Sequence, residues 1–456
     1  MNFRTLLTLF ACMFAIGMAV PAASADLRAG PMAGASYMRG ARLWMQADGP
    51  GKAVIDYWDT QAPKKILRTP AIALKAEEDF VAQFEIDALE PGRTYGYRVK
   101  IDGKEQKVPQ SLVFRTQALW QWRTDAPDWK LAFGTCAYTN EVAYDRPGRP
   151  YGGPPEAMNI YASIARQQPD MMLWGGDYLY HREVDVDSAM GLRYRWNRER
   201  AIPQVQSLLR TGHHFAIWDD HEYGLNDANG SYVLKGESLK LFKRFFANPS
   251  YGLPETPGVF GNFLFNDAEF FLTDNRYYRD SDWLIADDKT MLGAAQIRWL
   301  KNALLASVSP IKFIVVGSQV TNAANLTYEG WDKFPKERAE ILKFLIDQKI
   351  NGVMLLSGDR HFTEFLKTGR PGTYPLYELT CSSLTSGGSA ISSDEKGNSN
   401  VVPGTFSVPR NFCTIDFSGT QNARMLTLKN FSTDGKLIWE KEIALAELQT
   451  PTSTVP

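Results

Sequence analysis

Five short and almost uninterrupted apolar runs limit the possible folds of this chain more than any other feature of its 456 residues. In chain order they read KLAFG, MMLWG, HFAIW, IKFIVV and GVMLL. Runs of this length are typical of β-strands that are buried on both faces of a sheet. Helical patterns lie between several of them, at residues 155–168, 292–307 and 336–349. Strands that alternate with helices predict an α/β domain, which we place at residues 128–450.

Residues 26–118 have a different pattern of apolar and turn-forming residues. The runs ARLWMQA, KAVIDYW, FVAQFEI and YGYRVKI are rich in aromatic and β-branched residues, and turn-forming residues separate them. This pattern predicts an N-terminal all-β sandwich of the immunoglobulin or fibronectin type. A turn lies directly before Tyr95 and Tyr97. A tyrosine there either bonds back to the chain, as at the corner of such sandwiches, or only packs in the core.

The first 25 residues have the features of a secretory signal peptide. Arg4 supplies a positive charge, an apolar run covers residues 6–20, and the small residues Ala23, Ser24 and Ala25 form a cleavage pattern. No later apolar run is long enough to cross a bilayer. We therefore expect cleavage after Ala25, Sec-type export to the periplasm or the medium, and no transmembrane segment.

The charge and the cysteines restrict the possible partners and cross-links. The formal net charge is −1, so no overall electrostatic field favours nucleic acid, and we expect no specific nucleic-acid binding. Cys136, Cys381 and Cys413 remain after cleavage, which allows at most one disulfide. Cys381 and Cys413 are closer in sequence and are the favoured pair. Cys136 is then a single thiol that is either buried or functional. The oligomeric state stays open.

Polar residues that can bind a metal follow four of the apolar runs. These residues are Cys136, Asp177, Asp220 and Asp359. Sites in α/β sheets form beyond the carboxyl ends of the strands, so we expect these side chains to converge. Each residue alone is more often a core or capping residue. Together, clustered carboxylates repel one another unless cations neutralise them, so the pattern favours a metal site.

The types of the surrounding residues indicate two different metals. Tyr180, His221 and His361 stand beside the four strand-end residues. Oxygen ligands suit calcium or magnesium, whereas thiolate, phenolate and imidazole suit a transition metal. A mixed centre, with one iron-like and one calcium-like ion, therefore fits better than two zinc ions. The remaining histidines lack such surroundings and are expected to be surface or structural residues: His181, His213 and His214.

Several motifs together resemble the PhoD-like alkaline phosphatase and phosphodiesterase family of the calcineurin-like metallophosphatases. They are GTC, GGDYLY, WDDHE, SGDRH and YEGWDKFPKERAEIL. The resemblance covers nearly the whole mature chain, because that family has a β-sandwich before its catalytic domain. It implies an α/β (α+β) metallophosphatase sandwich of sheets flanked by helices.

The resemblance also implies roles for individual residues. Asp177 would bridge the two metals, Cys136, Tyr180 and His361 would bind ferric iron, and Asp220, Asn226 and Asp359 would bind calcium or another divalent ion. His221 would contact the phosphate or protonate the leaving group. Arg360 would either help to hold the ester or form a structural ion pair. Asp219 is a ligand or a support for Asp220, and the role of Glu222 stays open.

The function implied is hydrolysis of phosphate monoesters, diesters or both by a metal-activated water. The substrate would be a small-molecule, lipid or nucleotide phosphoester. A phospholipase D-like or nucleotide phosphodiesterase could use the same centre. An exported binding protein with purely structural metals is an alternative of another class. A serine hydrolase is disfavoured, because TCSSLTSG lacks the spacing of a nucleophile elbow.

Overall fold

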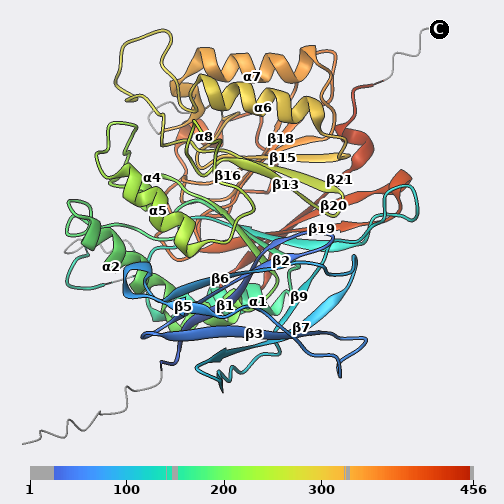
Figure 1. Cartoon of the computed structure of the whole chain (residues 1–456). Coiled ribbons are helices and arrows are strands. Elements are labelled where there is room, and N and C mark those ends of the chain that lie inside the picture. The colour runs from blue at the N-terminus through green and yellow to red at the C-terminus, as the bar shows by residue number, and fades with distance from the viewer. Residues whose placement is uncertain (1–24, 140, 146–151, 323, 325–328, 452–456) are drawn as a thin grey trace, which may run out of the picture.

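The computed structural model describes residues 25–139, 141–145, 152–322, 324 and 329–451. Two mixed β-sheets pack face to face, helices cover their outer faces, and a smaller sheet lies at one end (Figure 1). The predicted signal peptide lies outside the described residues except for Ala25. Among the described residues, no helix has both the length and the apolar character needed to cross a membrane.

The larger sheet has nine strands. Their order is β21 (Leu437–Ala444), β20 (Met425–Ser432), β19 (Asn411–Ser418), β10 (Trp129–Gly134), β11 (Met171–Gly175), β12 (His213–Ile217), β1 (Leu27–Ser36), β2 (Ala41–Ala47) and β6 (Val81–Ile86). The central strands β10, β11, β12 and β1 are parallel, and the outer strands are antiparallel. Strands β20 and β21 form a hairpin that turns at Asp434 and Gly435.

The second sheet of this sandwich has six strands. Their order is β13 (Gly261–Phe265), β14 (Ala268–Leu272), β15 (Ile311–Val315), β16 (Val353–Ser357), β18 (Leu376–Thr380) and β17 (Glu364–Thr368). The four central strands are parallel, and β13 and β17 are antiparallel edges. The parallel strands of both sheets include all five apolar runs, which confirms the predicted α/β character.

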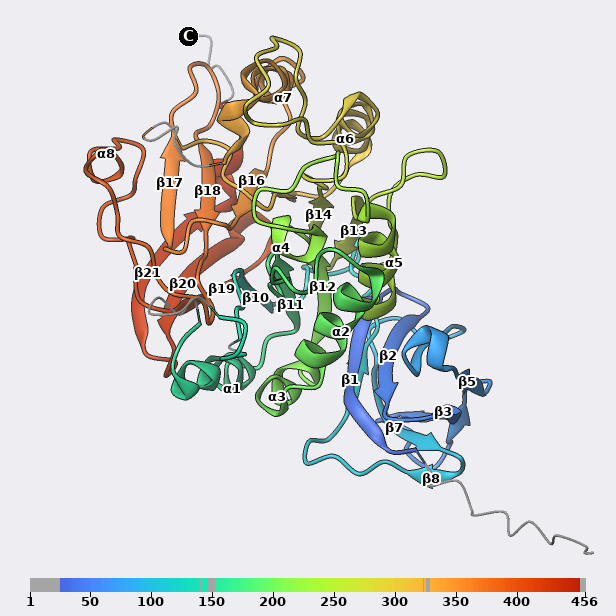
Figure 2. The same ribbon diagram turned by 90° about the vertical axis from the view of Figure 1, so that its left-hand side faces the viewer.

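Helices cover the two outer faces of the sheets (Figure 2). On the six-stranded side lie α6 (Ala294–Ala306) and α7 (Pro335–Asp347); on the other side lie α1 (Asn159–Arg166), α2 (Ala189–Arg200), α3 (Gln206–Leu209) and α5 (Lys235–Phe245). Two single-turn helices are α4 (Asp220–Tyr223) and α8 (Ser393–Lys396). The 3-10 turns are η1 (Ala76–Glu78), η2 (Pro155–Met158), η3 (Pro203–Val205), η4 (Trp331–Lys333), η5 (Gln421–Ala423) and η6 (Leu445–Leu448). Helices α1, α6 and α7 confirm the three predicted helical segments.

The alternation of side chains along a strand explains how one sheet serves two cores. In β10, Leu131 and Phe133 point into the core between the sheets, whereas Ala132 points into the core beneath α1, α3 and α5. Trp174 and Trp218 belong to this second core and are almost fully buried. Continuous apolar runs are needed because both faces of these strands are buried.

The N-terminal region forms the predicted sandwich. Strands β1, β2 and β6 pack against a small sheet in the order β4 (Leu67–Arg68), β3 (Gly51–Asp59), β7 (Thr94–Ile101) and β8 (Lys104–Glu105), with β5 (Ile72–Leu74) on β3 and β9 (Val113–Arg115) on β7. The Tyr95 hydroxyl accepts a hydrogen bond of 3.0 Å from the backbone N–H of Glu90. This bond confirms the tyrosine-corner alternative, while Tyr97 packs in the core.

The sandwich and the α/β region share one sheet. Strand β1 pairs in parallel with β12, and Ala33 lies opposite His213. The His213 imidazole contacts the carbonyl of Gly34 at 2.8 Å and accepts the backbone N–H of Arg115 at 3.0 Å. His213 is therefore structural, as expected. The boundary between residues 118 and 128 stays a prediction.

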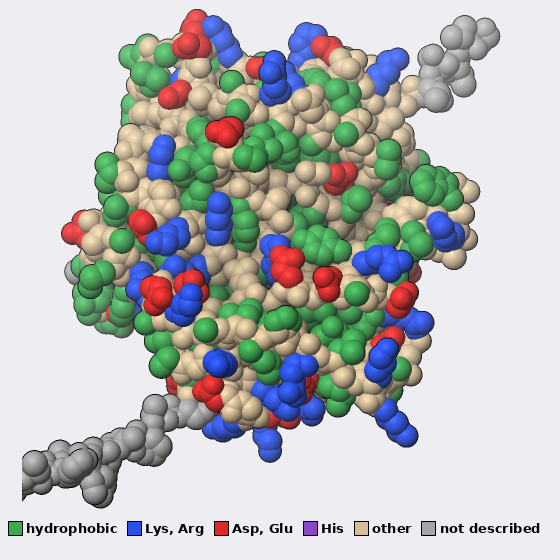
Figure 3. Space-filling view, viewed as in Figure 1, with side chains coloured by type: hydrophobic (Ala, Val, Ile, Leu, Met, Phe, Trp, Pro, Cys, Tyr) green, Lys and Arg blue, Asp and Glu red, His purple; other side chains and the backbone are tan. Residues whose placement is uncertain are grey.

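The cysteines follow the predicted pairing. Cys381 and Cys413 form a disulfide, and Cys136 is a buried free thiol. Because Cys381 follows β18 and Cys413 lies in β19, the disulfide links the two large sheets. On the molecular face shown in Figure 3, basic and acidic side chains are interspersed rather than separated.

Candidate metal centre

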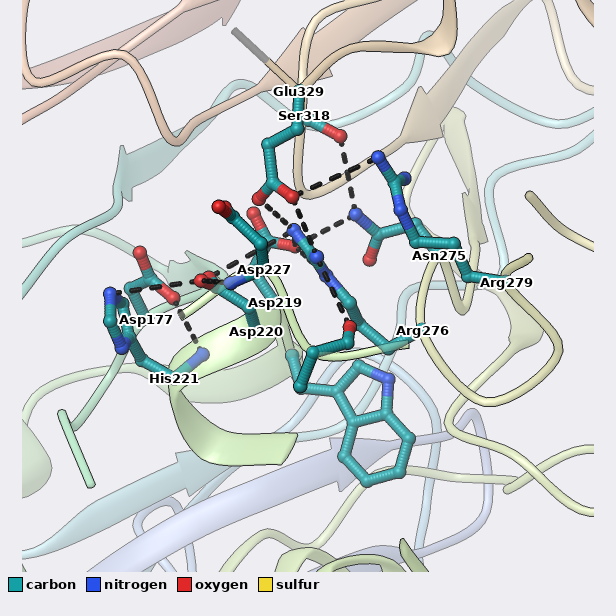
Figure 4. Close-up of polar contacts among 12 residues, drawn as sticks. Asp177, Asp219, Asp220, His221, Asp227, Asn275, Arg276, Arg279, Ser318 and Glu329 are labelled. Atoms are coloured by element: carbon teal, nitrogen blue, oxygen red, sulfur yellow. Dashed lines mark hydrogen bonds and ion pairs between the residues drawn. The ribbon is translucent and has the colours of Figure 1, made fainter. Parts of the chain in front are cut away.

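The carboxyl ends of the parallel strands meet at one edge of the sandwich. Cys136 follows β10, Asp177 follows β11, Asp220 follows β12 and Asp359 follows β16. The structure brings them together from both sheets, and Figure 4 shows Asp177 and Asp220 pointing toward one another. The helix α4 begins at Asp220, directly beyond the end of β12 (Figure 2).

One part of the centre contains sulfur, phenol and imidazole groups. The Cys136 thiol lies 3.6 Å from Oδ2 of Asp177, and the Tyr180 hydroxyl lies 3.2 Å from the same oxygen. Nε2 of His361 lies 3.1 Å from the Tyr180 hydroxyl. A thiol and a phenol thus lie beside one carboxylate oxygen, and an imidazole lies beside the phenol; these donor types suit a transition metal.

The other part of the centre is a chain of overlapping carboxylate groups. In each of three groups, the possible ligand atoms lie within 4.8 Å of one another: Asp177, Asp220 and His221; Asp219, Glu329 and Asp359; and Asp220, Asp227 and Glu329. Because Asp220 and Glu329 each belong to two groups, the three form a continuous region. This region extends from the thiol side and offers mainly oxygen ligands, which suit a hard divalent cation.

Four of the predicted ligands have a left-handed backbone conformation. The φ angles are 59° at Cys136, 54° at Asp177, 71° at Asp359 and 55° at His361. Each such non-glycine residue costs about 1–3 kcal/mol, and these conformations cluster at functional sites. The fold therefore tolerates an unfavourable backbone conformation at four residues of the centre.

Glu222 holds the two segments that carry the central carboxylates. Its carboxylate is fully buried and accepts the backbone N–H groups of Asp177 at 2.9 Å and Asp219 at 3.1 Å, together with that of Tyr178. Burial raises the Glu222 pKa to about 8, although these hydrogen bonds act in the opposite direction. Glu222 is thus a positioning residue, which resolves the role that the sequence left open.

Arg276 and Glu329 also contact the carboxylates of the centre, which the sequence did not suggest. Arg276 is fully buried, and its Nε lies 2.6 Å from Oδ1 of Asp219. Its Nη1 donates to Glu329 at 2.9 Å, and the Asn275 amide donates to Asp219 at 2.8 Å (Figure 4). Arg276 follows the apolar strand β14 in the sequence TDNR, so the strand-end signal used elsewhere would have found it.

Two predicted site residues, Asn226 and Arg360, are not grouped with the clustered ligands. Asn226 is exposed, while its neighbour Asp227 belongs to the carboxylate region. Arg360 is buried, donates to Oε1 of Gln319 at 2.9 Å and forms an ion pair with Glu395. Of the two roles predicted for Arg360, these contacts favour the structural ion pair.

The histidines separate as the sequence suggested. The His221 ring lies 3.9 Å from that of Tyr180, and its Nε2 lies 3.7 Å from Oδ2 of Asp220. His181 contacts the backbone carbonyl of His221 at 2.8 Å, and His214 is hydrogen-bonded to the indole of Trp174. His181 and His214 therefore support the fold, and His221 lies in the centre.

The electrostatics of the centre fit bound cations. Burial, followed by the charge of Asp220, raises the pKa of Asp177 well above its usual range. Burial likewise raises the Asp219 pKa to about 7, against the lowering effect of Arg276. Oδ2 of Asp219 and Oδ1 of Asp220 are buried and have no hydrogen-bond donor among the described residues. Buried carboxylate oxygens of this kind are stabilised by metal ions.

Comparison with known proteins agrees with this geometry. The family model described as PhoD-like phosphatase matches residues 255–424, and a model of a domain of unknown function, DUF7800, matches residues 24–118. Alkaline phosphatase D of Bacillus subtilis (strain 168) is 25% identical over 365 residues, which cover 68% of this chain. These matches support a PhoD-like phosphatase. The match spans only 59% of the length of the Bacillus relative.

Solved structures identify the fold of this PhoD-like chain. A structure of PhoD superimposes with a TM-score of 0.76 at 18% identity and covers 95% of this chain and 93% of its own. A purple acid phosphatase from yellow lupin (Lupinus luteus) seeds superimposes with a TM-score of 0.67 at 12% identity, covering 93% of this chain and 77% of its own. The predicted metallophosphatase sandwich with an N-terminal all-β region is confirmed.

Proposed function

We propose that this chain is an exported, metal-dependent phosphoesterase that hydrolyses phosphate monoesters, diesters or both. One observation carries the proposal: a thiol, a phenol, an imidazole and several carboxylates converge at the carboxyl ends of strands from two sheets. Buried carboxylate oxygens without donors lie in that cluster. The similarity to alkaline phosphatase D supports phosphoric esters as the substrate class.

We assign the two sides of the centre to different ions. Cys136, Tyr180 and His361 would hold ferric iron, Asp220 and Asp359 would hold calcium, and Asp177 would be shared. Asn226 stays a predicted calcium ligand, although another divalent ion could take the calcium place. The donor types support this division, because soft and phenolic donors lie together on one side and carboxylates on the other.

When bound, the two cations supply a water of lowered pKa and hold the phosphate oxygens. Asp177 keeps the two sides at a fixed separation, because Glu222 fastens its backbone. His221 lies beside Asp177 and Asp220 and is 8% exposed, so it can meet a phosphate or give a proton to the leaving oxygen. No residue has to act as a covalent nucleophile.

Replacement of Asp177 tests this function directly. Asp177→Asn keeps the shape of the side chain and removes its charge, so we expect a loss of several orders of magnitude in kcat/KM for p-nitrophenyl phosphate. Chelators should abolish the activity of the wild type. Asp434→Asn, in the β20–β21 turn, is the control and should retain activity. Near-normal activity of Asp177→Asn would show that the centre is misassigned.

Export is a separate part of the proposal. Residues 1–25 would direct Sec-type export and be removed, leaving the mature protein in the periplasm or the medium. Ala25 directly precedes the segment that leads into β1, so cleavage there would leave the first sheet intact. N-terminal sequencing of the mature protein should begin at Asp26. A mature protein that retains residues 1–25 would contradict the signal-peptide assignment.

A further inference from the structure

Arg410 is anchored to a loop that wraps the metal centre. It precedes β19 and is half-buried, and its Nε donates to the carbonyl of Thr385 at 2.8 Å. The same loop contacts Cys136 three times: the hydroxyl of Ser382 lies 3.1 Å from the thiol, and the N–H groups of Thr385 and Ser386 donate to the Cys136 carbonyl at 3.3 and 3.2 Å. Arg410 is therefore tied to the backbone that positions a predicted metal ligand.

The loop also connects Arg410 to His361. The N–H of His361 donates to the Ser382 hydroxyl at 3.0 Å, and the N–H of Ser389 donates to the His361 carbonyl at 2.8 Å. The segment 382–389, to which Arg410 is anchored through Thr385, is thus hydrogen-bonded to both Cys136 and His361.

Arg410 differs from the other arginines around the centre in its partners. Arg276 pairs with Asp219 and Glu329, and Arg360 pairs with Glu395. Among the described residues, no carboxylate forms an ion pair with Arg410, and only Nε of its guanidinium has a hydrogen-bond acceptor. The two Nη groups of Arg410 are therefore available to an anionic ligand.

The orientation of this guanidinium is restricted. A Cβ placed on Gly153 would lie 2.7 Å from Nε and 2.8 Å from Cζ of Arg410, so the group packs directly on the glycine backbone. The N–H of Gly153 donates to the same Thr385 carbonyl at 3.1 Å. With Nε fixed in this way, the two Nη groups form a preorganised fork, the geometry that suits phosphate oxygens.

We propose that Arg410 binds a non-bridging oxygen of the substrate phosphate and favours monoesters over diesters, a role that rests on the proposed phosphoesterase function. A monoester carries two negative charges at alkaline pH and has a terminal oxygen left for the guanidinium. A diester carries one charge, and its second ester group takes the place of that oxygen. Arg360, which the sequence suggested for this role, is engaged by Glu395.

Substitution of Arg410 tests the proposal on the metal-loaded protein. For Arg410→Gln we expect KM for p-nitrophenyl phosphate to rise about 10- to 100-fold, as for loss of a charge-assisted hydrogen bond. KM for bis(p-nitrophenyl) phosphate should change less than about threefold. Arg410→Lys should recover part of the monoester affinity, because it keeps the charge. Metal content and Tm should stay at the wild-type values.

Arg370 provides a matched control. It is half-buried, donates Nε to the carbonyl of Tyr374 at 3.1 Å and lies at the opposite end of β18 from the centre. Arg370→Gln should leave both KM values unchanged. Equal effects of Arg410→Gln on both esters, unchanged KM values, or loss of bound metal would each overturn the proposal.

A binding experiment separates failure of this inference from failure of the proposed function. If the wild type hydrolyses neither ester, the proposed function fails. Titration of inorganic phosphate into the metal-loaded protein then still tests Arg410. Weaker phosphate binding by Arg410→Gln, by about tenfold or more, supports the anion site. Unchanged phosphate binding overturns it.

Discussion

Glu222→Gln is the substitution that best tests how the fold positions the centre. The two oxygens of Glu222 accept three buried backbone N–H groups, those of Asp177, Tyr178 and Asp219. Glutamine has nearly the same shape but only one accepting oxygen. Whichever way the amide is turned, its NH₂ group faces at least one of these N–H donors.

The expected cost follows from this mismatch. One buried N–H left without an acceptor costs about 1–3 kcal/mol, and above about pH 8, where Glu222 is ionised, the remaining bonds also lose the contribution of its negative charge. We therefore expect the free energy of unfolding to fall by about 2–4 kcal/mol. The backbone of Asp177 would also be held less firmly, so metal affinity and phosphatase activity should decrease together.

Urea unfolding followed by tryptophan fluorescence measures the loss of stability, and elemental analysis measures bound metal. Glu237→Gln, whose side chain is half-exposed on α5, is the matched control and should change the unfolding free energy by less than about 0.5 kcal/mol. A Glu222→Gln variant that unfolds at the wild-type urea concentration and retains full metal content would refute the positioning role of Glu222.

Two further predictions concern the disulfide and the pH dependence. Replacing both Cys381 and Cys413 by serine opens a loop of sequence separation 32 and should lower the free energy of unfolding by about 4 kcal/mol. Urea titration measures this loss. An unchanged urea midpoint would show that the disulfide between the sheets does not stabilise the fold. Burial raises the pKa values of Asp219 and Asp227 to about 7 and that of Glu222 to about 8 in the metal-free protein. Because these folded-state values exceed the unfolded ones, the carboxyls bind more protons in the folded protein up to about pH 8. The buried histidines, whose pKa values are lowered, act in the opposite direction only below about pH 6.5, so stability should fall as pH rises from 6.5 to 8.5. Tm in EDTA should thus be lower at pH 8.5 than at pH 6.5, and added calcium should raise it more at pH 8.5. Equal Tm values at the two pH values, or a higher Tm at pH 8.5, would contradict the raised pKa values of these carboxyls.

Local patterns were sufficient to predict the elements and many residues of the centre. The apolar runs must be continuous because β10, β11 and β12 are buried on both faces. The residue after each run then lies at the edge where the strands end, so Asp177 and Asp220 could be grouped without a structure. The tyrosine corner was also readable, because Glu90 and Tyr95 are only five residues apart.

Contacts between distant segments explain what the sequence did not reveal. The pairing of β1 with β12 joins Ala33 to His213, and no local pattern encodes a contact over 180 residues. The ion pair of Arg360 with Glu395 spans 35 residues and depends on where α8 lies. Glu329 was within a quoted motif, but its approach to Arg276 depends on the course of a loop beyond β15.

The visible absorption spectrum of the purified protein, combined with its metal content, tests the central claim most directly. Ferric iron bound by the Tyr180 phenolate and the Cys136 thiolate should give a coloured protein that contains iron and calcium. Tyr180→Phe should lose the phenolate absorption and bind less iron, while Tyr194→Phe, whose side chain is half exposed on α2, should keep both. A colourless, fully active enzyme that contains zinc would contradict the assignment of the iron side of the centre.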